Sequence, residues 1–135
     1  MVGETEVKAA ICLIATLALA VACQGTFEER ELVGYYEDDL HRETLTLMTG
    51  GQYEETIHYN NGQVFQNAGK WSLVQGGEGS KVLLRSSILE GYYQTAGPEP
   101  RPTPLVGDFR LDARQLFGTL TLTWDDGPVL TRRHP

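Results

Sequence analysis

"TLTLMTGGQYEETIHY", residues 44–59, alternates apolar and polar side chains on either side of a glycine pair. Leu45 and Leu47 share one face before the glycines, and Tyr53, Ile57 and Tyr59 resume that face after them. Alternation with a period of two is the pattern of a half-buried β-strand, and glycine adopts the positive φ that a tight turn needs. The stretch therefore predicts a β-hairpin.

The same period continues after the next turn signal. "NNG" at residues 60–62 precedes "QVFQNAGKWSLV", in which Phe65, Gly69, Trp71 and Leu73 are evenly spaced. Asn and Gly both tolerate positive φ, so the break favours a turn between two strands. A second break, "QGGEGS", leads into another apolar stretch, "KVLLRSS".

The C-terminal part repeats this organisation. "FGTLTLTW", residues 117–124, places Leu120, Leu122 and Trp124 on one face and threonines on the other, and "PVLTRR" follows an Asp-Asp-Gly turn. The alternation predicts about eight short strands with no helix between them. A meander of this length leaves no free edge when it closes on itself. We therefore expect an all-β fold, a small antiparallel meander closing into a β-barrel.

The N-terminus is apolar but short. Residues 9–22, "AAICLIATLALAVA", are fourteen residues without a charge, whereas a membrane-spanning helix needs about 20. The length and the small residues at its end are typical of the apolar region of a secretory signal. The final residues, "ALAVAC", resemble a bacterial lipobox, in which Cys23 is lipidated and becomes the new N-terminus. The alternatives are an ordinary cleaved signal and a buried apolar helix with an incidental cysteine.

A lipobox implies three segments. We expect a lipoprotein signal helix at residues 1–22, a polar tether at 23–31 and a β-barrel domain at 32–135. Cys12 falls in the removed segment and Cys23 is used by lipid, so the mature chain has no internal disulfide. Several acyl chains, such as palmitate, give the stable anchoring that one chain alone does not. Lipoproteins that lack Asp after the lipidated cysteine resemble those sorted to the outer membrane. Gln24 follows Cys23 here, so we expect the chain on the periplasmic face of the outer membrane.

The charge balance is acidic. The chain has 18 acidic and 11 basic residues, and removing residues 1–22 changes the formal charge from −7 to −6. Nucleic acid needs clustered Lys and Arg, and only Arg132 and Arg133 are adjacent. An acidic surface does not attract anionic lipid, so membrane attachment is expected to depend on acylated Cys23.

Residues 34–73 resemble the N-terminal domain of the NlpE-type copper-resistance and envelope-stress lipoproteins, and the looser pattern covers residues 33–133. The shared motifs are Gly-x-Tyr at Gly34 and Tyr36, the strand Leu45–Leu47, Gly-x-Tyr at Gly51 and Tyr53, and Gly-x-Trp-Ser at Gly69–Ser72. The resemblance implies a small lipocalin-like barrel. Lipocalins also have a Gly-x-Trp on which a late arginine packs, and Gly34, Tyr36 and Arg132 are similar to that set.

One motif of that family is missing. Its Cys-x-x-Cys falls between the first two strands, where this chain reads "EDDLHRE" at residues 37–43. Soft metals bind thiolates and thioethers, so copper binding and thiol sensing do not carry over to this chain. No cofactor is expected.

Few residues suggest other chemistry. Glu37, Asp38, Asp39 and His41 are weak candidates for a hard-cation site, since carboxylate oxygens suit Ca²⁺ or Mg²⁺. A solvated hairpin loop explains the same residues, and His58 is expected on the outer face. The chain shows no nucleophile with a base, no metal-ligand spacing and no phosphate loop, so we predict that it is not an enzyme.

The long segment around residues 88–105 is the candidate interaction site. Its adjacent tyrosines and its prolines combine aromatic area with a stiff backbone, which lowers the entropy lost on binding. The alternative is that a tyrosine turns inward as a plug, and Trp71 and Trp124 are expected to fill the core. The candidate interaction residues are Tyr92, Tyr93, Pro98, Pro100, Pro102 and Pro104.

Three functions agree with these patterns. The first is a lipid-anchored, non-catalytic interaction module that contacts another envelope protein. The second is a barrel that carries a small apolar ligand, limited by the space that so short a chain encloses. The third is a periplasmic inhibitor or immunity protein.

The anchor gives the first prediction. The mature protein begins at Cys23 and carries lipid, because the thiol is the group that takes up the diacylglyceryl moiety. Cys23→Ala leaves the chain unprocessed or released, without a lipidated species. Mass spectrometry of the mature N-terminus checks this, and an unmodified peptide that begins at another residue contradicts it.

Overall fold

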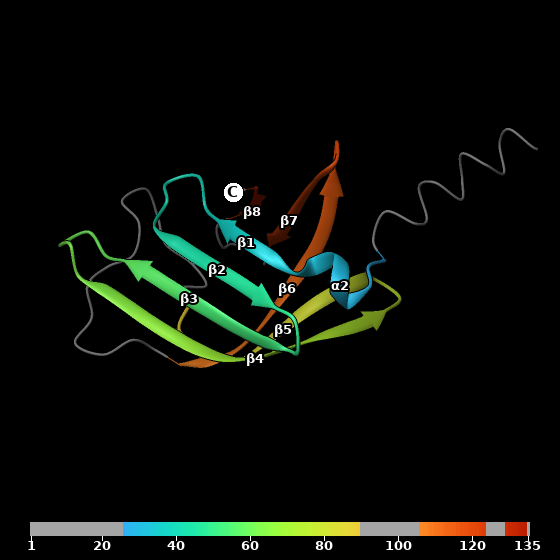
Figure 1. Ribbon diagram of the computed structural model, residues 1–135, viewed down its shortest axis with the longest axis horizontal. Helices are drawn as coiled ribbons and strands as arrows, with labels where there is room; N and C mark the ends of the chain where they lie inside the picture. Colours follow the sequence, from blue (N-terminus) through green and yellow to red (C-terminus); the bar gives the residue numbers. More distant parts are fainter. Residues whose placement is uncertain (1–25, 90–105, 124–128, 135) are drawn as a thin grey trace, which may run out of the picture.

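The fold is a closed β-barrel of eight antiparallel strands, as the alternation predicted (Figure 1). The computed structural model of the chain describes residues 26–89, 106–123 and 129–134. Each strand pairs with the next along the chain, and β1 pairs with β8 to close the barrel. The predicted signal helix lies outside the described residues.

Among the described residues, one short helix precedes the strands. The helix is α2, Glu29–Leu32. The strands are β1 Gly34–Glu37, β2 Glu43–Met48, β3 Gln52–His58, β4 Val64–Gly76, β5 Gly79–Ser87, β6 Gly107–Leu116, β7 Thr119–Thr123 and β8 Leu130–Arg133.

The meander gives the barrel two different ends. Helix α2 lies where β1 begins, at the end that also carries the short turns β2–β3, β4–β5 and β6–β7 (Figure 1). We call this the α2 end. The connections β1–β2, β3–β4, β5–β6 and β7–β8 lie at the opposite end, which we call the loop rim.

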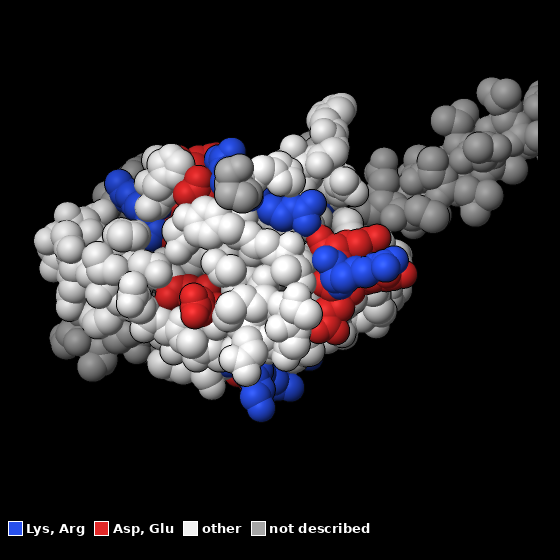
Figure 2. All heavy atoms as spheres, viewed as in Figure 1, with Lys and Arg blue, Asp and Glu red and all other residues white. Residues whose placement is uncertain are grey.

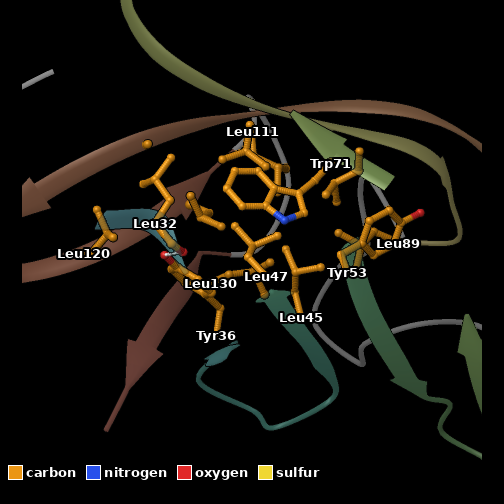
Figure 3. Packing of buried hydrophobic residues seen from close by; sticks show 14 of the residues in the cluster. Leu32, Tyr36, Leu45, Leu47, Tyr53, Trp71, Leu89, Leu111, Leu120 and Leu130 are labelled. Atoms are coloured by element: carbon orange, nitrogen blue, oxygen red, sulfur yellow. Dashed lines mark hydrogen bonds between the residues drawn. The ribbon is translucent and has the colours of Figure 1, made fainter. Parts of the chain in front are cut away.

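The inward residues of the strands form the core. Figure 3 shows Trp71 with Leu47 and Leu111 beside its ring, and the indole N–H donates to the carbonyl of Met48 at 3.0 Å. This hydrogen bond satisfies the one polar atom of a buried tryptophan. Trp71 is a core residue, as predicted, whereas Trp124 lies outside the described residues.

Gly69 explains part of the Gly-x-Trp motif. A Cβ at this position would lie 2.6 Å from the hydroxyl oxygen of Tyr53 and 2.7 Å from its ring. Gly69 and Tyr53 are register partners on β4 and β3, so the ring of the buried tyrosine covers the glycine. The motif therefore records close packing between two strands.

The prediction of a polar tether at residues 23–31 is wrong for residues 26–31, the part of it that the structure describes. Phe27 is only 7% exposed and belongs to the core cluster. Its N–H donates to Ser80 Oγ at 2.8 Å, and the Gln75 amide donates to its carbonyl. Phe27 therefore fixes the segment before α2 to the core and to β4 and β5.

Helix α2 is fixed by a capping box and by the barrel wall. The side chains of Glu28 and Glu31 satisfy backbone N–H groups of the first turn, and Leu32 is fully buried. The Tyr36 hydroxyl donates to the Leu32 carbonyl at 2.7 Å, and Arg132 donates to the Glu31 carbonyl at 2.7 Å. The end of the helix is thus held by β1 and β8 together.

Arg132 packs on the glycine that opens β1. A Cβ on Gly34 would lie 2.9 Å from Arg132 Cδ, so the arginine stem occupies the space that a side chain would need. Arg132 is also the register partner of Tyr36. The set of Gly34, Tyr36 and Arg132 identified in the sequence meets in space where the barrel closes.

Candidate functional site: the loop rim of the barrel

Exposed aliphatic residues ring the loop rim. The structure describes seven large hydrophobic residues as exposed, and four of them lie at this end, one beside each connection. Leu40, in β1–β2, is 56% exposed and Val106, just before β6, is 64% exposed. Val64 begins β4 and Val129 precedes β8. Four residues distant in sequence thus give one end of the barrel apolar area on its outside.

The β1–β2 loop is held in place by a buried carboxylate. Asp38 Oδ1 accepts hydrogen bonds from the backbone N–H groups of Arg42, at 2.7 Å, and Glu43, at 2.9 Å. The Asp38 N–H in turn donates to the Glu43 carbonyl at 3.1 Å. The loop that carries Leu40 therefore has a defined backbone, which lowers the entropy cost of binding.

An ionic group lies on the outer side of the same loop. Glu37 Oε2 lies 3.0 Å from His41 Nδ1, and Glu37 Oε1 lies 3.3 Å from Arg133 Nε. The hydrogen bond with His41 is the main cause that lowers the pKa of the Glu37 carboxyl, and Arg133 lowers it further. Asp39 lies 3.9 Å from the Arg133 guanidinium. Such surface pairs orient side chains more than they stabilise a fold.

The weak cation-site candidates of the sequence are not arranged as a metal centre. Asp38 accepts from backbone amides, Glu37 and Asp39 pair with Arg133, and His41 pairs with Glu37. Among the described residues, no group of three or more His, Cys, Asp or Glu side chains is placed to hold a metal ion.

Glu55 is a second buried carboxylate that fixes the backbone near the loop rim, and it was not among the site residues predicted from the sequence. Its carboxylate faces the barrel interior and is 2% exposed. Oε1 accepts from the Ile88 N–H at 2.6 Å and from the Asn67 amide at 2.7 Å, and Oε2 accepts from Ser87 Oγ at 2.7 Å. Glu55 thus ties β3 to β4 and to the residues that follow β5.

The pKa of the Glu55 carboxyl is raised, because burial raises it more than the three hydrogen bonds lower it. A buried carboxylate loses its hydration, so the charged form is disfavoured. Burial also raises the pKa of Tyr53, and the neighbouring Glu55 carboxylate adds to that effect. The Tyr53 hydroxyl donates to the Arg85 carbonyl. This end of the barrel interior is therefore a closed hydrogen-bond network.

A β-bulge marks the exit of β5. The register with β6 shifts between Leu84 and Ser87, and Ser86 has a φ of +53°. The Ser86 N–H donates to Asp108 Oδ1 at 2.9 Å, and the Asp108 carboxylate also pairs with Arg85 at 2.8 Å. Bulges redirect a strand, and this one aims the chain into the long β5–β6 connection.

The residues predicted for the interaction surface belong to that connection. Tyr92, Tyr93, Pro98, Pro100, Pro102 and Pro104 lie outside the described residues. Both flanks of the segment, residues 87–89 and 106–107, lie at the loop rim. The placement of the tyrosines, outward or as a plug, stays a prediction. His58 is exposed, as predicted.

A hollow lies on the outer wall of the barrel where β1 pairs with β8. It has a volume of about 930 Å³ and lies over β8, β1 and β2. Tyr35, Met48 and Arg133 are among its lining residues, and Tyr35 is 40% exposed. The Tyr35 hydroxyl donates to Glu37 Oε2 at 3.3 Å. The hollow is therefore shallow and apolar with a charged border.

Charge is scattered on the face seen in Figure 2. Lys, Arg, Asp and Glu form small separate groups there, and a mixed group of both signs lies over α2. Phosphate-rich partners need a continuous basic surface, which this face lacks.

Comparison with models of known families, with curated proteins and with solved structures found no match to this chain. Within the described ranges, no helix has the length and apolar character needed to cross a membrane.

Glu55 gives the second prediction. Glu55→Gln keeps an acceptor for Ile88 and Asn67 and lets the new amide donate to Ser87, so the fold is retained. Glu55→Ala leaves three polar groups without their acceptor and lowers the free energy of unfolding by about 2–4 kcal/mol. Urea unfolding of the two variants measures the difference. Equal destabilisation by both substitutions contradicts the hydrogen-bond account.

The pH dependence of the same residue has a definite sign. Because the folded-state pKa is raised, the contribution of Glu55 to stability is largest below about pH 4.3, the ordinary pKa of Glu, and falls as the pH rises through the raised pKa. Glu55→Gln removes this loss, so its stability relative to the natural chain improves between pH 4 and 7. A constant difference over that range contradicts the assignment.

Proposed function

We propose that this chain is a bacterial envelope lipoprotein, anchored through acylated Cys23 to the periplasmic face of the outer membrane, that acts as a non-catalytic interaction module. The loop rim contacts a second envelope protein. The scaffold is that of the NlpE-type lipoproteins without their Cys-x-x-Cys. No cofactor takes part, and nucleic acid is not a partner.

The observation that carries this proposal is the ring of exposed aliphatic side chains at the rim. Exposed apolar area that is grouped at one end of a domain is typical of a protein-binding surface. The Asp38 and Glu55 carboxylates hold the backbone beneath two of the four connections. Rigid loops that present apolar side chains lose little entropy when a partner binds.

The ligand-carrier alternative has less support. Side chains from every strand, with Phe27 and Leu32 from the segment before β1, form the core cluster inside the barrel. An eight-stranded barrel has an interior just wide enough for side chains or for one small ligand. The inhibitor or immunity alternative uses the same rim, so the identity of the partner separates it from a general interaction module.

The third prediction tests the rim. A photo-crosslinking residue at position 40 or 129 of the full chain, in cells, forms a discrete adduct with one envelope protein. The same residue at position 74, an exposed site near the α2 end, forms none. Equal adducts from all three positions contradict the proposal. An adduct with a hydrolase whose activity the chain suppresses supports the inhibitor alternative.

The fourth prediction concerns the affinity for the partner that the crosslink captures. The double substitution Leu40→Ser and Val129→Ser removes exposed apolar area and weakens the affinity for the purified partner roughly tenfold. The melting temperature stays nearly unchanged because both side chains are exposed. Val74→Ser is the matched control and leaves the affinity unchanged. A weakened control or an unchanged double variant contradicts the assignment of the rim.

A further inference from the structure

The tip of the β6–β7 hairpin exposes an aromatic side chain that the fold does not use. Phe117 is 98% exposed, the largest exposure among the large hydrophobic residues that the structure describes. Leu116 and Thr119 are the last register pair of the two strands, so Phe117 and Gly118 alone form the turn. The sequence pattern placed Phe117 at the start of a strand, which is wrong.

The backbone at this tip does not favour phenylalanine. Phe117 has a φ of +51° and Gly118 a φ of +79°. Two-residue hairpin loops with positive φ at both positions strongly prefer Asn-Gly or Asp-Gly, and a bulky side chain is an outlier there. Neither packing nor turn geometry therefore accounts for Phe117. A residue that costs the fold and contributes no internal contact points to a contact outside the domain.

The tip lies at the α2 end, near the point where the chain enters the barrel. Figure 1 shows α2 and the β6–β7 hairpin toward the same end of the molecule. A hollow of about 430 Å³ lies between Thr26 and Phe27 on one side and Gln115 and Leu120 on the other. Gln115 is two residues from Phe117, so the hairpin tip and the segment that follows the predicted anchor lie at the same end of the barrel.

Covalent geometry limits how far that anchor is from the barrel. Four Cα-to-Cα steps separate Cys23 from Phe27, and each step spans at most about 3.8 Å, so the two Cα atoms lie within about 15 Å of each other. Phe27 is buried at the α2 end. A lipid on Cys23 therefore holds the α2 end, and not the loop rim, against the bilayer. This step rests on the proposed function.

We propose that the α2 end faces the membrane and that Phe117 inserts into the lipid interface as a second apolar contact beside the acylated cysteine. Aromatic side chains at the surface of peripheral proteins bury in the boundary between headgroups and acyl chains. The second contact fixes the orientation of the barrel, and the loop rim then points away from the bilayer into the periplasm.

The preferred lipid surface follows from the charges around the tip. The segment beside it carries Glu28, Glu29 and Glu31 against Arg30. Arg114 is exposed on β6, and Arg132 lines the same hollow as Phe27. The two signs therefore balance near the tip, and no net charge draws it toward anionic headgroups. The contact is apolar and is made with a zwitterionic phospholipid surface, and added anionic lipid does not strengthen it.

A single-cysteine label reads the orientation directly. Phe117→Cys and Leu40→Cys are each made in the lipidated mature protein, where the Cys23 thiol is already a thioether, and a polarity-sensitive dye is attached. In vesicles of zwitterionic phospholipid with spin-labelled headgroups, the dye at position 117 is quenched and the dye at position 40, on the loop rim, is not. Equal quenching at both positions, or quenching at 40 alone, overturns the proposal.

A substitution separates membrane contact from a structural role. Phe117→Asn creates the Asn-Gly pair that such a turn prefers, so the melting temperature stays equal or rises. The partition of the unlipidated mature chain, Cys23→Ser, into zwitterionic vesicles falls roughly tenfold or more when Asn replaces Phe117. A lower melting temperature with unchanged partition assigns Phe117 to the fold. A change in oligomeric state with unchanged partition assigns it to a second copy of the chain, and both results overturn the proposal.

The two proposals fail in different ways. Mass spectrometry of the N-terminus decides the anchor before any vesicle is used. If Cys23 carries no lipid, the proposed anchoring is wrong, and the partition of the Cys23→Ser chain still shows whether Phe117 contacts the bilayer. If Cys23 is lipidated and the dye at 117 stays unquenched, the anchor stands and the membrane contact of Phe117 is wrong.

Discussion

The pairing of β1 with β8 is the constraint on which the rest of the structure depends. It turns an open meander into a barrel without edges, because every other neighbouring pair is joined by a direct chain connection and this one is not. Arg132 of β8 reaches across this pairing. Its aliphatic stem packs on Gly34, and its guanidinium donates a hydrogen bond to the carbonyl of Glu31. An unpaired β1 and β8 would also release α2, whose last carbonyl is bound by Tyr36.

The meander makes the two ends of the closed barrel different. One end is filled by Phe27 and Leu32 and joined by short turns, while the other carries the longer connections and the buried Glu55. The first end receives the chain from the N-terminus, so it is the end that a lipid on Cys23 would hold. The second end presents the exposed aliphatic side chains. The proposal that one end faces the membrane and the other contacts a partner builds on this difference between the two ends.

The strand pattern could be predicted because local sequence determines it. Alternation identified the inward face at Leu45, Leu47, Tyr53 and Trp71, and the glycine pair identified the turn after β2. The same alternation puts Glu55 on the inward face, but a charged residue there is tolerated only with hydrogen-bond partners. Those partners come from residues 12 to 33 positions further along the chain, so no local pattern shows them.

Other features depend on contacts that sequence does not display. Phe27 is a single aromatic residue in a charged segment, without the periodicity that marks a core element, and its burial depends on packing against distant strands. The Glu28 and Glu31 capping box was a local signal that could have indicated a helix start. The loop rim could not be predicted as one surface because its exposed residues lie beside four different connections. Phe117 was misplaced because Phe-Gly is an unusual pair for a two-residue turn.

Hydrogen exchange of the seam amides tests the central claim most directly. If β1 and β8 close the barrel, the central backbone amides of β1 and β8 are as strongly protected as those of β3, which has partners on both sides. Unprotected β1 and β8 amides in a chain whose β3 amides are protected would contradict closure of the barrel.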